Sequence, residues 1–180
     1  MVIRYFLFAL LGVAFWTFME YIIHRFLGHQ KRGKNIIRQE HLRHHAEAHY
    51  FAPLYKKLLL AILVLSTSTL LFGIIFNWLT GFSFSLGLAG MYVIYEVTHR
   101  RFHIKDPLLR YGLRMRKHHF YHHFGNPKLN HGVTTAIWDR VFGTFEKTTV
   151  IRVPDKIAMN WLRDGQDNLK PRYKRHFQIY

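Results

Sequence analysis

The sequence predicts an all-α integral membrane protein with about three membrane spans and a cytosolic helical cap rich in histidine. Two observations support this fold class. Long apolar segments alternate with strongly basic ones, in a chain of 180 residues that is 49% hydrophobic and has a formal net charge of +16. The chain also has 14 histidines and no cysteine. We expect residues 1–180 to form a single membrane-embedded domain.

Three apolar segments are candidates for membrane spans, because about 20 apolar residues cross a bilayer. They cover residues 2–23, 58–79 and 80–97. The first is charged only at Arg4 and Glu20, near its two ends. It is too long for the apolar region of a signal peptide, and no small-residue cleavage site follows it, so we expect it to be retained. The second has no charge, and the third is uncharged until Glu96.

The charges predict how these spans are oriented. Only the tripeptide TGF joins the second and third spans, which therefore form a tight hairpin. Lysine and arginine gather in the His-rich segments 24–57 and 98–153, and the hairpin has none. The positive-inside rule places this basic face in the cytoplasm, at the inner membrane of a bacterium or the endoplasmic reticulum of a eukaryote. Attraction of anionic lipid or an acidic protein is an additional interpretation, whereas no motif indicates nucleic-acid binding.

Nearly all the histidines fall on this basic face, in patterns with helical spacing. The motifs HLRHH and HFYHH each place three histidines at i, i+3 and i+4, and HRRFH places two at i and i+4. In HRFLGH the two histidines are five residues apart, about 140° round an ideal helix. We therefore expect that helix to end or bulge near Gly28, with His29 bending back.

These patterns indicate a metal site. Without cysteine, a metal ion must be held by histidine and carboxylate, and two imidazoles at i and i+4 can bind one ion. The alternative is a scattered set of polar surface histidines, which would make the repeated motif on one membrane face a coincidence. His118 lies about 100° round the helix from His119. We expect His118 to face solvent, with support of a neighbouring imidazole as its other possible role.

Four motifs resemble the fatty acid hydroxylase and sterol desaturase superfamily in order and spacing: EYIIHRFLGH, HLRHH, YEVTHRRFH and HFYHHF. The segment NHGVTTAIWDRVFGTF looks like the tail motif of the fatty acid hydroxylase branch, closest to fatty acid 2-hydroxylases. Few residues precede the first span, so we expect the haem domain and the first of four spans, both common in the family, to be absent. His131 stands where the tail motif usually has an aromatic residue, a departure that bears on the substrate more than on the metal.

The resemblance implies a dinuclear iron centre in the cap, with O₂ as co-substrate and electrons from an external donor such as a ferredoxin or small cytochrome. Zinc could replace iron in purified samples, because it binds most nitrogen sites more tightly than Fe²⁺. Carried over position by position, the ligands would be His24, His29, His41, His44, His45, His99, His103, His119, His122 and His123. Candidates to orient these ligands are Glu20, Glu96, Asp139 and His118. For Glu20 and Glu96 the alternative is to reach the interface or to pair with an arginine.

The resemblance implies an O₂-dependent membrane lipid hydroxylase that acts on a fatty acyl chain near its carboxyl end. One alternative is a sterol or carotenoid hydroxylase or desaturase of the same superfamily. An alternative from another class is a non-enzymatic, His-rich membrane metal-binding protein. At the C-terminal end, residues 154–180 predict an amphipathic helix, which begins at Pro154 and ends at Gly165, followed by a basic tail.

Overall fold

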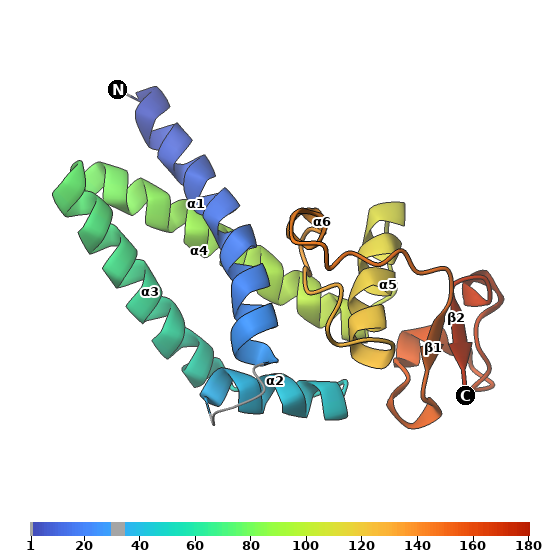
Figure 1. Cartoon of the computed structure of the whole chain (residues 1–180). Coiled ribbons are helices and arrows are strands. Elements are labelled where there is room, and N and C mark those ends of the chain that lie inside the picture. The colour runs from blue at the N-terminus through green and yellow to red at the C-terminus, as the bar shows by residue number, and fades with distance from the viewer. Residues whose placement is uncertain (1, 30–34) are drawn as a thin grey trace. The chain divides into compact units, whose positions relative to one another are not determined.

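The structure is a computed structural model that describes residues 2–29 and 35–180. It is mostly helical, as predicted (Figure 1). The helices are α1 (Val2–Ile22), the π-helical turn η1 (Ile23–Gly28), α2 (Ile36–Ala46), α3 (Leu54–Ile75), α4 (Trp78–Ile104), α5 (Arg110–Phe124) and α6 (Ile137–Val141). Two short strands follow, β1 (Ile151–Val153) and β2 (Phe177–Ile179).

The chain divides into two compact units. The first comprises Met1–Met19 and Ala52–Glu96, and the second comprises Glu20–Phe51 and Val97–Tyr180. Within the residues that the structure describes, three stretches are long and apolar enough to cross a membrane: Val2–Gly28, Leu54–Ile75 and Trp78–Ile104. The number of spans therefore agrees with the sequence prediction.

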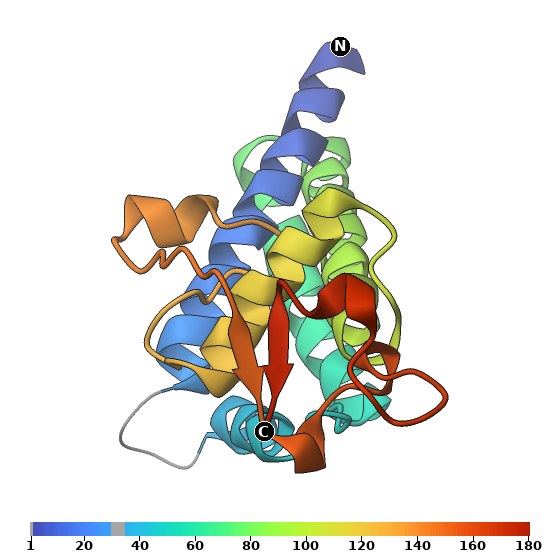
Figure 2. The ribbon, with the colours of Figure 1, turned by 90° about the vertical axis from the view of Figure 1, so that its right-hand side faces the viewer.

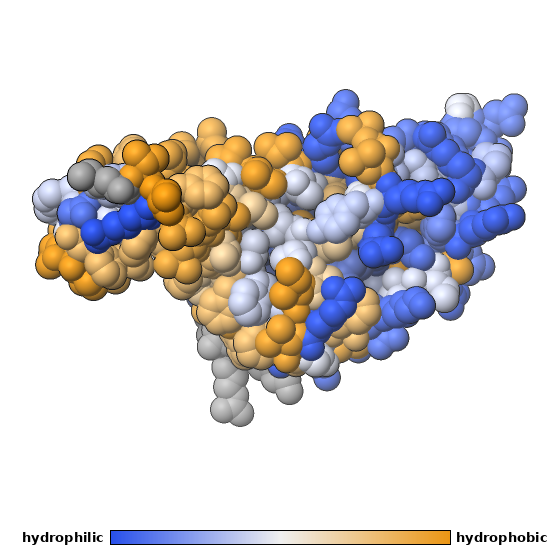
Figure 3. Space-filling view, turned by 90° about the horizontal axis from the view of Figure 1, so that it is seen from above, coloured by the Kyte–Doolittle hydropathy of each residue, from blue (hydrophilic) through white to orange (hydrophobic). Residues whose placement is uncertain are grey.

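The first unit exposes most of its apolar side chains. Leu59 and Ile74 of α3 are 66% and 71% exposed, and hydrophobic residues cover the face of this unit seen in Figure 3. Such a surface would be unfavourable in water, but it suits helices whose surroundings are lipid chains. The chain is therefore an integral membrane protein.

The hairpin between α3 and α4 lies earlier than predicted. The turn is at Phe76 and Asn77, and the TGF tripeptide is already inside α4. Asn77 ends the turn by capping the new helix, because its Oδ1 accepts a hydrogen bond from the backbone N of Thr80 at 2.9 Å. Gly81 lets the two helices approach, since a Cβ there would lie 2.4 Å from the Thr69 carbonyl oxygen. The helices that correspond to the predicted spans 58–79 and 80–97 are therefore Leu54–Ile75 and Trp78–Ile104.

Glycines also bring α1 against α4 within the first unit. A Cβ on Gly12 would lie 2.0 Å from the carbonyl oxygen of Phe84, and one on Gly87 would lie 1.9 Å from that of Ala9. Close backbone approach at small residues is the usual way that helices pack in a membrane.

In the second unit, one buried arginine joins the end of α4 to α5. The Arg116 guanidinium donates from Nη2 to the carbonyl oxygens of Arg101, Lys105 and Asp106 at 3.1, 3.0 and 3.3 Å. Arg101 lies in the last turn of α4, and Lys105 and Asp106 follow its last residue, where backbone carbonyls begin to lack intrahelical partners. Arg116 thereby caps α4 from α5 and fixes the two helices against each other.

The C-terminal segment packs on α5 as a small parallel strand pair (Figure 2). Ile151 pairs with Phe177, and Val153 pairs with Ile179. The predicted amphipathic helix after Pro154 is wrong: the segment forms only three-residue 3₁₀ turns, at Asp155–Ile157 and Asn160–Leu162. The segment buries Ala158, Met159, Trp161 and Leu162. Four buried positions among five residues cover more than one side of an α-helix.

Candidate metal centre

Ten histidines of the second unit form two groups. The first histidine group comprises His24, His29, His41, His45 and His122. The second histidine group comprises His44, His99, His103, His119 and His123. Within each group, one ring nitrogen from every residue lies within 4.8 Å of the others. The structure thus brings together all ten histidines singled out in the sequence.

Each HxxHH motif is divided between the two groups. In α2, His41 and His45 belong to the first group and His44 to the second. In α5 the division is reversed, because His119 and His123 belong to the second group and His122 to the first. Residues at i and i+4 lie about 40° apart round a helix, whereas i+3 and i+4 lie about 100° apart. The i,i+4 pair therefore serves one group, and the third histidine faces the other.

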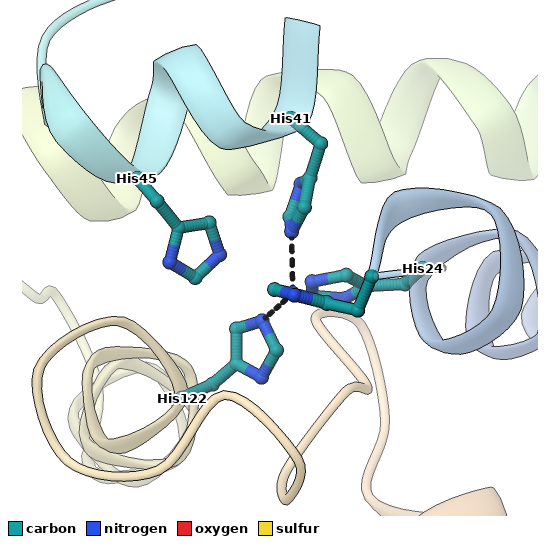
Figure 4. A group of neighbouring side chains, drawn as sticks. His24, His41, His45 and His122 are labelled. Atoms are coloured by element: carbon teal, nitrogen blue, oxygen red, sulfur yellow. Dashed lines mark hydrogen bonds between the residues drawn. The ribbon is translucent and has the colours of Figure 1, made fainter. Parts of the chain in front are cut away.

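A π-helical turn completes the first group. His24 lies within η1, and His29 follows its last residue, Gly28. A π-turn has i→i+5 hydrogen bonds, so two residues five apart come close to one side. The structure therefore has both the bulge and the helix end that the spacing of HRFLGH predicts. Figure 4 shows His24, His41, His45 and His122 turned toward one another from three segments.

The closest nitrogens in the first group cannot all be joined by hydrogen bonds. Nε2 of His29 lies 2.7 Å from Nε2 of His41 and 2.8 Å from Nε2 of His122. A neutral imidazole nitrogen either donates one hydrogen or accepts through one lone pair, so His29 can satisfy only one of these contacts. Nitrogens about 2.1 Å from a shared metal ion would lie roughly 3 Å apart. The arrangement therefore fits ligands of one ion.

Several other ring nitrogens of the two groups are buried and unsatisfied. Within residues 2–29 and 35–180, no hydrogen-bond partner is found for Nε2 of His24 and His45, Nδ1 of His119, or either nitrogen of His123. Leaving a buried polar atom unpaired costs about 1–3 kcal/mol. A metal ion in each group would take up one nitrogen from each ring, including one of the two nitrogens of His123, so the donor set fits such an ion.

Burial keeps these imidazoles neutral. Burial lowers the pKa of His45 to about 3 and that of His29 to about 4. Burial, followed by the neighbouring rings, also holds the pKa well below the usual range for His41, His119, His122 and His123. Neutral imidazole is the form that binds metals.

The two groups are neighbours. The rings of His45, from the first group, and His123, from the second, stack with their centroids 4.1 Å apart. Two metal ions held by these groups would therefore share one centre.

Main-chain carbonyls orient several of these rings. Nδ1 of His122 donates to the carbonyl oxygen of Leu129 at 2.8 Å, and Nδ1 of His44 donates to that of Tyr50 at 2.6 Å. Nδ1 of His24 contacts the carbonyl oxygen of His131. Since a carbonyl only accepts, each ring has its hydrogen on Nδ1 and a lone pair on Nε2. These partners could not be predicted, because a backbone carbonyl leaves no mark in the sequence.

Glu20 binds the loop that contains Val133 and Thr134. Its Oε1 accepts from the backbone N of Val133 at 2.5 Å and of Thr134 at 2.9 Å, and its Oε2 accepts from Thr134 Oγ1 at 2.6 Å. This loop begins beside the carbonyl of His131 that contacts His24. Glu20 therefore supports that histidine indirectly, whereas we expected it to hold an imidazole.

Asp139 is fully buried and accepts four hydrogen bonds. The donors are the backbone N of His131 and of Gly132, the hydroxyl of Thr144, all at 2.8 Å, and Nε2 of His118 at 2.9 Å. Burial alone would raise the pKa of Asp139, but these hydrogen bonds outweigh it and hold the pKa below its usual value. The expectation that His118 faces solvent is wrong, because the segment around Asp139 covers that side of α5.

Glu96 forms an ion pair, as in the alternative interpretation, with a lysine in place of an arginine. Its Oε2 lies 2.5 Å from Nζ of Lys57, within the first unit.

The fold and the site define an integral membrane protein with a His-rich, metal-binding centre. The chain belongs to the fatty acid hydroxylase family, whose model matches residues 9–144. It is 36% identical over 143 residues to the fatty acid 2-hydroxylase of Mus musculus, covering 74% of this chain and 38% of that protein. It is 32% identical over 161 residues to a dihydroceramide fatty acyl 2-hydroxylase of Arabidopsis thaliana, covering 80% of this chain and 62% of that protein.

A solved structure has the same fold. It is described as full-length scs7p with only the hydroxylase domain visible. The TM-score is 0.64 at 29% identity, covering 81% of this chain and 57% of that one. The chain thus spans less than two thirds of each of these relatives. The comparisons confirm the family resemblance that the histidine motifs indicated.

Proposed function

We propose that the chain is an O₂-dependent membrane lipid hydroxylase. In this proposal the ten histidines hold two iron ions, and the substrate is a fatty acyl chain that is hydroxylated near its carboxyl end. The observation that carries the proposal is the pair of adjacent groups, each with five buried or half-buried imidazoles.

The side chains suit this chemistry. Iron, when bound, supplies with O₂ the oxidising power that no amino-acid side chain has. The ten imidazoles bind as neutral ligands, so they leave the positive charge of the ions uncompensated. The carbonyls of Leu129 and Tyr50 fix the rings of His122 and His44, so the donors are in place before an ion arrives.

The relatives favour an acyl substrate over a sterol or carotenoid. The names of the mouse and plant proteins specify fatty acid and fatty acyl 2-hydroxylation, which is oxidation next to the carbonyl carbon. Helix α4 also continues without a break from its apolar residues to His99 and His103. Ligands attached directly to a membrane-spanning helix suit a substrate that stays in the bilayer.

The reaction also needs electrons from outside the chain. We assign them to a ferredoxin or small cytochrome on the cytoplasmic side. The net charge of +16 and the basic segments beside the spans support this orientation and an acidic partner.

The test is lipid analysis of cells that express the chain together with a competent electron donor. We expect 2-hydroxylated acyl lipids with the wild type and with His49→Ala, because His49 is exposed and outside both groups. His119→Ala should abolish the product. The contrary result is a wild-type protein that holds two irons while the lipids of the cells match those of cells without the chain. That result would refute the hydroxylase and favour the non-enzymatic metal-binding protein.

A further inference from the structure

One more histidine lies beside the first histidine group. His131 is 2% exposed and comes from the segment between α5 and α6. Its ring centroid is 5.1, 5.5 and 6.0 Å from those of His122, His24 and His29. Spacings inside the group are similar, for example 5.6 Å between His24 and His29 and 6.0 Å between His41 and His122.

The backbone on both sides of this ring is fixed. The N–H of His131 donates to Asp139 Oδ1 at 2.8 Å, and its carbonyl contacts His24. The preceding residue, Asn130, is fully buried with a left-handed φ of 58°. The Asn130 side chain bonds both backbone groups of Glu146, at 2.7 and 3.0 Å. His131 is therefore held where it is by its main chain.

The hydrogen bond of the ring shows which nitrogen is bare. Nε2 lies 3.1 Å from the carbonyl oxygen of Lys128, which only accepts, so Nε2 has the hydrogen. With that hydrogen on Nε2, the other nitrogen of a neutral imidazole, Nδ1, has a lone pair. Nδ1 is buried and has no hydrogen-bond partner among the residues that the structure describes. A buried lone pair beside the rings of His24, His29 and His122 is well suited to a metal ion.

We infer that His131 supplies a sixth nitrogen, Nδ1, to a divalent metal ion held by the first histidine group. The other histidines outside the two groups lack this combination: His49 is exposed, His118 bonds Asp139, and His176 is only half-buried. The two ions would then be unequal, with six histidine donors at the first and five at the second. This inference rests on the proposed metal centre, and it assigns His131 to the metal where the sequence suggested the substrate.

Three variants at this position separate the two ring nitrogens. His131→Phe keeps a ring and removes both nitrogens. His131→Asn places an amide atom near the position of Nδ1, and His131→Gln places one near Nε2. All three keep the backbone groups that contact Asp139 and His24.

The experiment is a chelator titration of the purified full chain loaded with Co²⁺, followed by metal release and by the cobalt absorption spectrum. We expect wild type to release two ions in separate phases. His131→Phe and His131→Gln should lower the affinity for one of the two ions by about 10- to 100-fold and change the absorption bands of that ion. The other ion should be unchanged, and His131→Asn should lie closer to wild type.

The outcomes distinguish this inference from the proposed function. Wild-type chain that binds fewer than two ions would contradict the metal centre itself. Wild-type chain that binds two, with the same affinities and spectrum in His131→Phe, would overturn only the role of His131. If His131→Phe does not fold, equal metal binding by His131→Asn and His131→Gln would overturn it.

Discussion

Asp139 and the loop around it show how single side chains support the site. One carboxylate receives hydrogen bonds from the backbone that places His131 and from the ring of His118, which precedes His119 in α5. Its effect on the metal centre is therefore positional. The sequence offered this residue as a candidate without revealing its partners, because nothing in the chain order shows that α5 meets the segment around Asp139.

Asp139→Asn should destabilise the protein by about 3 kcal/mol. The asparagine side chain accepts hydrogen bonds only through its oxygen, so the donors that bond the other carboxylate oxygen would be buried without a partner. The thermal midpoint in detergent would fall by roughly 6–12 °C. The matched control is Asp167→Asn, at a side chain that is 81% exposed and a φ of 64° that asparagine tolerates. Equal midpoints for the two variants would contradict the role of Asp139.

The buried imidazoles predict that the metal-free chain loses stability in acid. In the unfolded chain histidine titrates near pH 6.5, whereas burial holds the pKa of His119, His122 and His123 well below that value. Below about pH 6.5 the unfolded chain therefore binds more protons, and stability falls as the pH falls. Thermal midpoints should drop between pH 7.5 and 5.5 and stay level from pH 7.5 to 8.5. A level response across the lower range would contradict this account.

At the scale of elements, the junction of α4 and α5 should control the second histidine group, because those helices supply four of its five members. Arg116→Met removes the guanidinium that caps α4. Burial lowers the pKa of Arg116 to about 10, so the group is charged at pH 7.

We expect Arg116→Met to weaken metal binding at the second group and to leave the first group unchanged, as measured by chelator titration. Arg114→Met is the matched control, since Arg114 is exposed on the same helix. Equal loss of both ions in Arg116→Met, or equal behaviour of the two variants, would show that the junction has no selective role.

The helices and turns also show how much of the fold and of the site could be predicted from the sequence. Spacing predicted that His24 and His29 need a bulge or a helix end, because five residues do not fit an α-turn. Spacing alone could not divide the HxxHH motifs, since which side of α2 or α5 faces which group depends on tertiary packing. The hydrophobic pattern also failed at two other places. At Asn77 the side-chain amide caps a new helix and so sets the turn. After Pro154 the segment is buried on several sides, which an amphipathic helix does not allow.

For the whole molecule, the metal ions should stabilise the second unit, whose ligands come from η1 and the residue after it, and from α2, α4 and α5. Removing the metal with a chelator should therefore increase hydrogen exchange in α2 and α5 and leave α3 of the first unit unchanged. Unchanged exchange in α2 and α5 would contradict a shared site.

The central claim is that the two histidine groups hold one metal ion each. It is tested most directly by counting iron per chain after anaerobic loading with Fe²⁺, in wild type, in His41→Ala of the first group and in His119→Ala of the second. We expect two ions in wild type and one in each variant. Fewer than two ions in wild type, or two in both variants, would contradict it.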